Sequence, residues 1–412
     1  MKSVILAAVS FLIILFSCRK DEFSSDPSLR LETSADTLHF DTVFTTTGSV
    51  SQFIKIMNNN DKGMEIATVR LAGGAASPFK INADGRPGPE VNMIEIAGND
   101  SVYVYVTVKI DPNASNLPFI VRDSIEIRYN GNTEWVQLEA FGQNAHFFRN
   151  RKITGNEVWN NDLPYVLLDG LTIDTTATLT ITKGCRIHIN ARSPFIVNGT
   201  LIVQGEKWDS TRVVFTGDRL DVPYRDFPAS YPGIFFSESS TNNDIRYALI
   251  KNAYQGLVVN ERSTNANPKL RIRESIIDNA YDIGLFGINS TIRAENLLIS
   301  NSGKNLILVK GGAYEFIHCT IASVSTDYLP HREPVVYIAD YINNGPPSAL
   351  TALFQNCILW GEVNGLVKNE VISSKKGNLF NLTFRDVVWR VEASPANANI
   401  VNTMNLSDPG FI

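Results

Sequence analysis

One long segment of this 412-residue chain gathers side chains that could recognise a sugar. The segment runs from Asp218 to Pro232, which is too long for an ordinary turn, and long loops are where function usually lies. Aromatic rings could stack on a pyranose, and carboxylate and guanidinium groups could hydrogen-bond its hydroxyls. The candidate ligand-binding residues are Asp218, Arg219, Asp221, Tyr224, Arg225, Asp226 and Tyr231. The alternative is a structural flap with buried rings.

A second long insertion, from Asp327 to Ser348, presents the same two alternatives with weaker chemistry. Its polar and aromatic side chains include Tyr328, His331, Arg332 and Glu333.

Acidic residues that could catalyse hydrolysis are harder to place. Cleavage of a glycosidic bond needs two carboxyl groups that flank it. Glu274 and Glu295 could lie in one column, which Tyr247 begins and His318 and Asn356 continue. No Lys or Arg recurs beside these acids at the same spacing, so we interpret the column as a solvated face and expect no catalytic residue. No His/Cys pair has the spacing of zinc ligands, so we expect neither a metal nor a cofactor.

The start of the chain has the pattern of an export signal. Lys2 precedes an apolar run from Val4 to Phe16, and Ser17 stands directly before Cys18. The run is too short for an ordinary membrane span. The pattern resembles the lipobox of bacterial lipoproteins, which implies cleavage after residue 17 and a lipid on Cys18. The alternative is a plain cleaved signal in which the cysteine is incidental.

Residues 18–28 have the composition of a flexible tether. The charged run Arg19-Lys20-Asp21-Glu22 resembles the signals that send some Gram-negative lipoproteins to the outer face of the outer membrane. The resemblance predicts lipid anchorage in the outer membrane with the protein facing the cell exterior. Envelope proteins are then possible partners, and an anchor that faces the periplasm is the alternative.

Composition limits the remaining functions. The net charge is −5 and no basic stripe with interleaved aromatic residues occurs, so we expect no nucleic-acid partner. A hydrophobic content of 44% is enough for two sizeable cores. Besides Cys18 there are Cys185, Cys319 and Cys357. The last two hold equivalent repeat positions, and we favour buried free thiols over a disulfide between them.

The region from residue 29 to residue 146 is predicted to be a β-sandwich. Short alternating runs separated by turn residues are typical of that fold. Asn130-Gly131 indicates a type I′ hairpin turn, because this turn needs positive φ at both positions. The clearest runs are Thr37–Phe40, Gln52–Ile56, Ser101–Val108, Ser124–Tyr129 and Trp135–Leu138.

The motif order in this region resembles the Ig-like domains of the major-sperm-protein and abnormal-spindle family. A strand with Phe40 leads through Gly48 into a strand from Phe53 to Asn60, and Ser77–Ile81 matches a mid-domain Pro-Phe strand. In bacteria the resemblance implies a spacer or adhesive module, and it carries over no active residue.

From residue 153 onward a repeat appears, in which a small residue is followed, two positions later, by a large aliphatic one. A period of 20–30 residues built from short strands is typical of a parallel β-helix, in which equivalent positions stack. Leucine-rich repeats lack support, because their Leu-x-x-Leu-x-Leu spacing is absent. The alignment predicts one buried column made of Ile250, Ile277, Leu298, Ile321 and Leu359.

The first turns of this region resemble right-handed β-helix proteins of the pectin-lyase-like class. The resemblance rests on Leu171–Ile173, Ala177–Ile181 and Val197–Leu201, and it indicates the fold while saying little about activity. The printed chain stops just after Asp408–Phe411 without a capping helix, which leaves a longer natural C-terminus open.

The sequence therefore predicts an all-β protein with a signal peptide over 1–17, a tether over 18–28, an Ig-like sandwich over 29–146 and a right-handed parallel β-helix over 153–412. We expect a non-catalytic envelope lipoprotein that binds or displays at polysaccharide. The alternative is a carbohydrate-active enzyme, a polysaccharide lyase or glycoside hydrolase, that uses a face of the β-helix. Two carboxylates and a base that converge in an exposed cleft would favour the enzyme.

Overall fold

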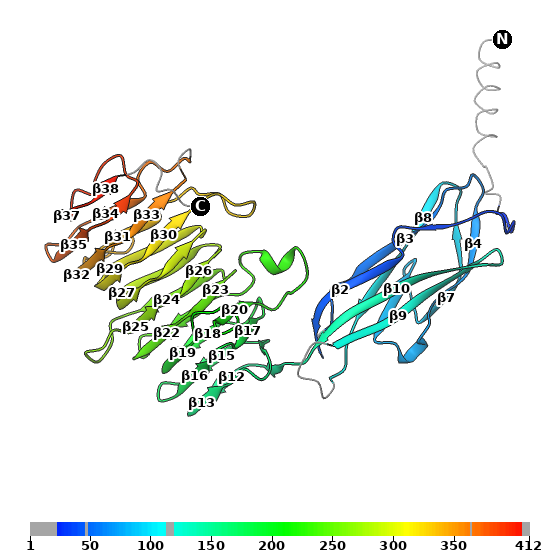
Figure 1. The fold of residues 1–412 in the computed structure, drawn as a ribbon, viewed down its shortest axis with the longest axis horizontal. Helices are drawn as coiled ribbons and strands as arrows, with labels where there is room; N and C mark the ends of the chain where they lie inside the picture. The colour runs from blue at the N-terminus through cyan, green and yellow to red at the C-terminus, as the bar shows by residue number, and fades with distance from the viewer. Residues whose placement is uncertain (1–22, 46–47, 113–118, 363–364, 406–412) are drawn as a thin grey trace, which may run out of the picture. The chain divides into compact units, whose positions relative to one another are not determined.

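The computed structural model describes residues 23–45, 48–112, 119–362 and 365–405. The chain divides into two compact units, Met1–Asn144 and Ala145–Ile412, the sandwich and the coil (Figure 1). The predicted signal peptide, Cys18 and the charged run 19–22 lie outside the described residues. No helix within the described ranges is long and apolar enough to cross a membrane.

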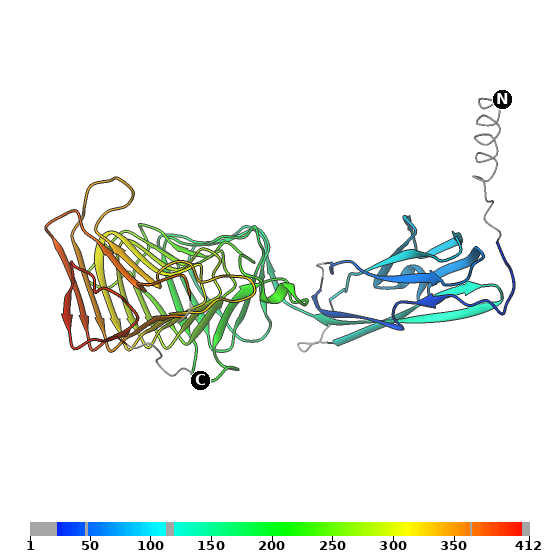
Figure 2. The same ribbon diagram turned by 90° about the horizontal axis from the view of Figure 1, so that it is seen from above.

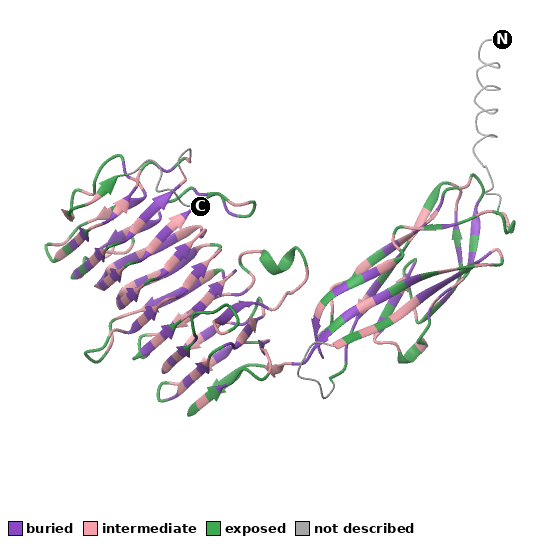
Figure 3. Cartoon of the chain, in the orientation of Figure 1, coloured by how far each residue is buried: buried purple, intermediate pink, exposed green. Residues whose placement is uncertain are grey.

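The first unit is a β-sandwich, as the sequence predicts. Its two sheets share one apolar core, in which buried and outward residues alternate along the strands (Figure 3). One sheet has the order β1 (Glu32–Thr33), β3 (Gln52–Asn58), β8 (Asp100–Val108), β5 (Phe79–Ala83), β6 (Arg86–Pro87). The other has the order β2 (Thr37–Phe44), β10 (Asn132–Gln143), β9 (Phe119–Tyr129), β4 (Met64–Leu71), β7 (Glu90–Ile96).

Pairing in the sandwich is antiparallel except between β2 and β10, which run parallel. The β9–β10 hairpin has Asn130 at φ 44° and Gly131 at φ 76°, which confirms the predicted turn with positive φ at both positions. Tyr129 and Asn132 are paired across it.

The second unit is a parallel β-helix, a coil whose strands stack turn upon turn in Figures 1 and 2. Its described strands form three parallel ladders. The first ladder contains β11 (His146–Phe148), β14 (Tyr165–Leu167), β17 (Arg186–Ile189), β20 (Val213–Gly217), β23 (Ala248–Lys251), β26 (Ile276–Asp278), β28 (Leu298–Ser300), β30 (Thr320–Ser323), β33 (Ile358–Gly361), β36 (Val388–Trp389) and β38 (Met404–Asn405).

The other two ladders are joined by β27 (Ile283–Glu295) and β29 (Lys304–Ile317), whose two halves each pair with a different ladder. The second ladder further contains β12 (Arg151–Ile153), β15 (Leu171–Ile173), β18 (Phe195–Val197), β21 (Ile234–Phe236), β24 (Gln255–Asn260), β31 (Val336–Ala339) and β34 (Val371–Ser374). The third further contains β13 (Asn156–Trp159), β16 (Thr178–Thr182), β19 (Thr200–Gln204), β22 (Asn243–Arg246), β25 (Leu270–Arg273), β32 (Leu350–Gln355), β35 (Phe380–Arg385) and β37 (Asn399–Val401).

The predicted buried column exists, but one member is wrong. Ile250 pairs with Ile277, which pairs with Ile299, and the column continues through Ile321 to Leu359, all fully buried. Leu298, the predicted member, lies one residue off and belongs to the outward position. A one-residue slip moves a strand side chain to the other face.

The slip has a local cause at the corner before these strands. Equivalent corner residues have left-handed backbone, with φ near 50° at Tyr247, Glu274, His318 and Asn356. In the turn that contains β28, the corner residue is Asn296, at φ 49°, and not Glu295. The predicted column with two stacked glutamates is therefore wrong: Glu295 is a strand residue paired with Arg273.

The cysteines of the described residues, Cys185, Cys319 and Cys357, are buried and free. The thiols of Cys319 and Cys357 lie 3.6 Å and 3.4 Å from the carbonyl oxygens of Ala294 and Phe316 on the preceding turn. The stacking of like residues thus places small thiols in the core, as favoured from the sequence.

Candidate functional site

The two long interruptions of the repeat meet on the first ladder. The loop of residues 218–233 joins β20 to β21 and contains the short 3-10 helix η2 (Tyr224–Asp226). The segment of residues 324–335 joins β30 to β31. The rings of Phe227 and Tyr328 lie 4.9 Å apart, and Tyr224 continues the contact 5.1 Å from Phe227. Tyr224 and Tyr328 are 44% and 43% exposed, so an open aromatic surface joins the two segments.

The predicted insertion from 327 to 348 is not a single loop. Strand β31 lies inside it and joins the second ladder by pairing with β29 and β34. Only the part before β31 reaches the loop of residues 218–233 through ring contacts.

Between these segments lies a cleft of about 260 Å³, called the loop cleft below. The 218–233 loop contributes Asp226, and the 324–335 segment contributes Thr326 and Tyr328. The coil itself contributes Lys251, Asn252, Asp278, Asn279 and Asn301. The loop cleft therefore combines aromatic, amide, ammonium and carboxylate groups.

Corner asparagines of the coil hold the loop in place. Asn252 Nδ2 donates to the carbonyl oxygen of Arg225 at 2.7 Å, and Asn279 Nδ2 donates to that of Asp226 at 3.0 Å. Asn279 Nδ2 also lies 2.8 Å from Asn252 Oδ1. Both asparagines have positive φ, at 66° and 55°, which Asn tolerates better than most residues. One wall of the loop cleft is thus fixed before any ligand arrives.

The charged groups of the loop cleft come from outward positions of neighbouring turns. Lys251 on β23 lies opposite Asp278 on β26 in the strand register. Asp278 Oδ1 accepts hydrogen bonds from Ser300 Oγ at 2.6 Å and from Asn301 Nδ2 at 3.2 Å. The carboxylate is therefore oriented, and its second oxygen can accept a bond from a ligand hydroxyl.

Some predicted loop residues serve the loop itself. Arg219 makes two bonds of 2.7 Å to the Asp221 carboxylate, which lower the pKa of Asp221, and its guanidinium lies 4.0 Å from the centre of the Tyr224 ring. Asp218 accepts a bond of 2.8 Å from Asn190 Nδ2, while burial raises the pKa of Asp218. Arg219 thus positions Tyr224, which remains exposed, while Asp218 ties the start of the loop to Asn190.

Tyr231 is not available to a ligand, which corrects its place among the predicted binding residues. The side chain is 1% exposed, belongs to the coil core, and its residue bridges to Ala253. Burial raises the pKa of the Tyr231 hydroxyl. The flap interpretation holds for this residue, whereas Tyr224, Arg225 and Asp226 remain on the surface.

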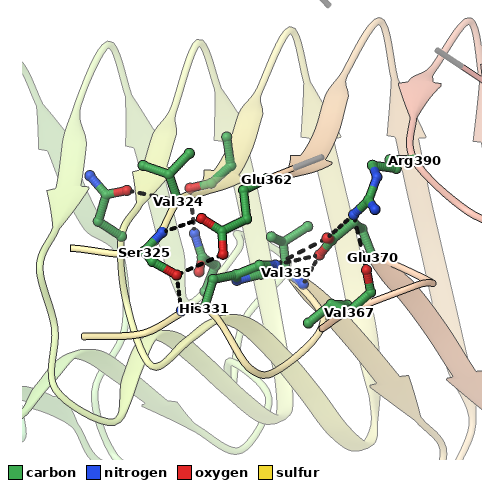
Figure 4. A network of polar contacts seen from close by, with 11 residues as sticks. Val324, Ser325, His331, Val335, Glu362, Val367, Glu370 and Arg390 are labelled. Carbon is green, nitrogen blue, oxygen red and sulfur yellow. Dashed lines mark hydrogen bonds and ion pairs between the residues drawn. The ribbon is translucent and has the colours of Figure 1, made fainter. Parts of the chain in front are cut away.

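A network of polar contacts, buried at His331 and Glu370 and exposed at Ser325, holds the 324–335 segment on the coil (Figure 4). His331 Nε2 lies 3.0 Å from Glu370 Oε1, and Arg390 Nη1 lies 3.3 Å from the same oxygen. Ser325 donates to the Glu362 carboxylate from its hydroxyl at 2.7 Å and from its backbone N–H at 2.9 Å. His331, singled out in the sequence, is therefore a buried anchor for the segment that carries Tyr328.

The glutamates considered for catalysis have separate partners. Glu274 Oε1 accepts a bond of 2.8 Å from Asn296 Nδ2, and Glu295 pairs with Arg293 Nε at 2.7 Å. Among the residues that the structure describes, no group of three or more His, Cys, Asp or Glu side chains could hold a metal ion.

Sequence reasoning missed Lys251 and Asp278 as cleft residues. Their shared outward position follows only once the register of β23 and β26 is known. The signal that could have found them is the asparagine directly after each, Asn252 and Asn279, because these corner residues mark equivalent places in successive turns.

The chain matches no protein-family model, and no curated protein matches it significantly. Solved structures do match. A family 123 glycoside hydrolase from Clostridium perfringens is 15% identical with a TM-score of 0.22, covering 31% of this chain and 26% of the enzyme. The chain thus spans about a quarter of that enzyme's length.

Two further solved structures match the chain. The ASH/PapD-like domain 7 of human CEP192 is 11% identical with a TM-score of 0.19, covering 31% of this chain and 94% of that domain. The catalytic unit of a GH87 α-1,3-glucanase from Streptomyces thermodiastaticus is 9% identical with a TM-score of 0.24, covering 85% and 88% of the two chains. No conclusion about this chain is drawn from matches with these identities and TM-scores.

Proposed function

We propose that this protein is a glycan-binding envelope lipoprotein whose ligand occupies the loop cleft. The observation that carries the proposal is a hollow that Tyr328, Lys251 and Asp278 line together. The aromatic surface continues from Tyr328 through Phe227 to the exposed ring of Tyr224. Aromatic faces bury the apolar side of a sugar ring, and oriented charged groups bond its hydroxyls. The fixed backbone of the loop reduces the entropy lost on binding.

A second candidate function has its own support in the same place. Two carboxylates, Asp226 and Asp278, line the loop cleft, and a pair of carboxyl groups is what glycoside hydrolysis requires. Binding remains the preferred function because both carboxylates already have partners within the protein. Asp278 accepts hydrogen bonds from Ser300 and Asn301, and Asp226 pairs with Arg225 at 3.4 Å.

The test of binding uses the double variant Tyr224→Ala/Tyr328→Ala against an array of purified polysaccharides. We expect the variant to lose at least about tenfold in affinity for the glycan that wild type retains, because two stacking surfaces disappear. The matched control is Tyr103→Ala/Tyr105→Ala, which removes a pair of exposed, stacked tyrosines from the sandwich. Equal loss in both double variants would contradict a site in the loop cleft.

Product analysis on the same array separates the two candidate functions. The binding proposal expects no new reducing ends or unsaturated products from any glycan. Turnover that Asp278→Asn or Asp226→Asn abolishes would instead establish the enzyme.

The membrane address is part of the proposal. A lipid on Cys18 would tether the protein to the outer membrane, and the run Arg19-Lys20-Asp21-Glu22 would direct it to the cell exterior. Cys18→Ala is expected to move the protein from the membrane fraction to a soluble one. Replacement of Lys20, Asp21 and Glu22 by Ala is expected to keep the anchor and abolish cleavage by protease added to intact cells.

A further inference from the structure

The outer face of the third ladder carries arginines stacked on arginines. Arg246 on β22 pairs with Arg273 on β25, and Arg271 on β25 pairs with Arg293 on β27. Paired residues on adjacent strands lie about 4.8 Å apart, and like charges placed opposite each other destabilise a sheet. The earlier turn has Ile202 and Gln204 at these positions, so the coil does not require arginine there.

Neighbouring acids pair with two of these four arginines. Asp244 binds Arg273 at 2.8 Å. Arg293 is bound by Glu295 at 2.7 Å and by Glu315 at 3.4 Å. Among the described residues, Arg246 and Arg271 have no acidic side chain within ion-pair distance. The two arginines lie diagonally across the β22–β25 pair, because Arg246 is opposite Arg273 and Arg271 is opposite Asp244. Their guanidinium donors remain for an anion.

Each of these two arginines opens onto a hollow at one end of β22. Arg246 lines a hollow of about 380 Å³ with Lys207, Trp208 and Tyr247. One acid, Glu206, also lines it and is paired with Lys183 at 2.9 Å. Arg271 lines a second hollow, of about 240 Å³, with Asn242, Asn267 and Asp244, whose carboxylate is paired with Arg273. The four residues of β22 span roughly 10 Å, so the two hollows are the ends of one short surface.

Trp208 gives the first hollow its chemistry. Its side chain is 63% exposed, so most of the indole is not used in packing, and Lys207 Nζ lies 4.5 Å from the centre of its ring. Tyr247 stands on the opposite corner with the Arg212 guanidinium 5.7 Å from its ring. An exposed indole beside an unpaired guanidinium suits a ligand that is both a ring and an anion.

We propose that this surface, Trp208 with Arg246 and Arg271, binds an acidic saccharide. One sugar ring stacks on Trp208, its carboxylate or sulfate takes the Arg246 guanidinium, and the next anionic group takes Arg271. At the far end Asn242 Nδ2 and Asn267 Oδ1 bond hydroxyls, since Asn267 Nδ2 already donates to Asn242 Oδ1 at 2.9 Å. The site lies on a different ladder from the loop cleft and does not depend on it.

The test is calorimetric titration of the full-length protein in detergent with defined probes. The carboxylate probe is an oligogalacturonate, the sulfate probe is a sulfated dextran oligosaccharide, and neutral dextran of equal length and single-stranded DNA are the comparisons. We expect at least one acidic saccharide to bind and neutral dextran and DNA to bind at least about tenfold more weakly. Which acidic probe binds identifies the anionic group.

Variants then locate the site. Arg246→Ala/Arg271→Ala and Trp208→Ala are each expected to lose about tenfold or more in affinity, because each removes charge-assisted bonds or the stacking surface. The matched control Arg192→Ala/Arg385→Ala removes two other exposed arginines of the coil and is expected to bind like wild type. Retained binding by Tyr224→Ala/Tyr328→Ala separates this site from the loop cleft.

The proposal is overturned if neither acidic saccharide binds, if DNA binds as tightly as they do, or if the two site variants keep wild-type affinity. An equal loss in the control variant would also overturn it, since binding would then follow net charge alone.

Discussion

The sandwich and the coil are both built from short alternating strands, but their registers are set by different interactions. In the sandwich a local turn sets the register: Asn130-Gly131 places Tyr129 opposite Asn132. In the coil each strand pairs with one a full turn away, and a buried column such as Ile277–Ile299–Ile321 sets the register. A hairpin therefore shows its register in adjacent residues, whereas a coil shows it only across turns.

The same difference decides where a function can reside in the coil. Regular turns repeat the same positions, so their surfaces repeat too. The loop cleft exists because two segments, 218–233 and 324–335, depart from the repeat and meet through Phe227 and Tyr328. The surface that carries Arg246 and Arg271 exists because outward positions of β22 and β25 hold other residue types than the same positions on the preceding turn.

The largest expected effect tests the register of the coil with two adjacent residues. Ile299→Asp places a charge in the buried column and should cost at least roughly 4 kcal/mol of unfolding free energy. Leu298→Asp changes an outward side chain and should cost less than about 1 kcal/mol. Denaturant unfolding of both variants measures the difference. Comparable losses would refute the assigned register.

The next effect compares a glutamate held between two basic side chains in each unit. In the coil Glu370 is fully buried with His331 and Arg390, whereas in the sandwich Glu126 is 3% exposed but its partners Arg70 and Arg128 are 41% and 52% exposed. Glu370→Ala leaves buried groups without their acceptor and should cost roughly 3 kcal/mol. Glu126→Ala should cost about 1 kcal/mol, because its partners can turn to water.

Protease digestion extends this comparison to the loop cleft. Glu370→Ala is expected to expose the 324–335 segment to cleavage and to weaken glycan binding, since the segment carries Tyr328. An uncut segment in that variant would show that the network in Figure 4 does not hold it.

Much of the fold could be predicted from the sequence, because alternation and repeat spacing are local or periodic signals. The type I′ hairpin, the two kinds of β domain and the buried thiols follow from such signals. The turn that contains β28 could not be aligned correctly from the sequence, because Leu297-Leu298-Ile299 offers three adjacent aliphatic residues. Only the corner at Asn296 decides which of them is buried in the column.

The candidate site was predictable only in part. The length of the 218–232 loop and the rings within it pointed to the surface, but Tyr231 and Tyr224 look alike in sequence and only one is exposed. The meeting of Phe227 with Tyr328 joins residues about a hundred positions apart, and Lys251 and Asp278 needed the register. Contacts of this range leave no trace in a single sequence.

The two units are expected to lose stability in different pH ranges, which is a smaller effect. Burial lowers the pKa of His188, on the first ladder, to about 4, and its Nδ1 lies 3.2 Å from the carbonyl oxygen of Gly217. Below the unfolded value near 6.5 the unfolded chain binds a proton that the folded coil refuses. The stability of the coil should therefore fall as pH drops from about 6.5 towards 4.

The sandwich should respond in a lower window. The hydrogen bond from Arg70 lowers the pKa of Glu126, so this contribution is present above the ordinary carboxylate range near 4.3 and is lost below it. Between pH 7 and 5 we expect the coil of wild type to lose more stability than the coil of His188→Gln. Over the same range the loss of stability in Glu126→Gln should equal that of wild type. Denaturant midpoints at both pH values measure this. Parallel pH profiles for wild type and His188→Gln would contradict the assignment.

The smallest effect compares left-handed asparagines in the two units. Asn130 in the hairpin has φ 44°, and Asn301 at a coil corner has φ 48°. Replacing either by Ala should cost about 1 kcal/mol, because a β-carbon disfavours this backbone more when no polar side chain compensates. Replacement by Gly removes the backbone cost and leaves only lost side-chain bonds.

The two asparagines differ in what their side chains hold. Asn130 Nδ2 donates to the carbonyl oxygen of Ser24 at 3.0 Å, while Asn301 Oδ1 accepts from the Val324 N–H at 3.3 Å. Asn301→Gly should therefore recover most of the stability yet loosen the start of the 324–335 segment, which protease digestion would detect. Asn130→Gly should recover stability without any effect on that segment. If both glycine variants changed cleavage of the segment equally, the corner asparagine would have no specific part in holding the loop cleft.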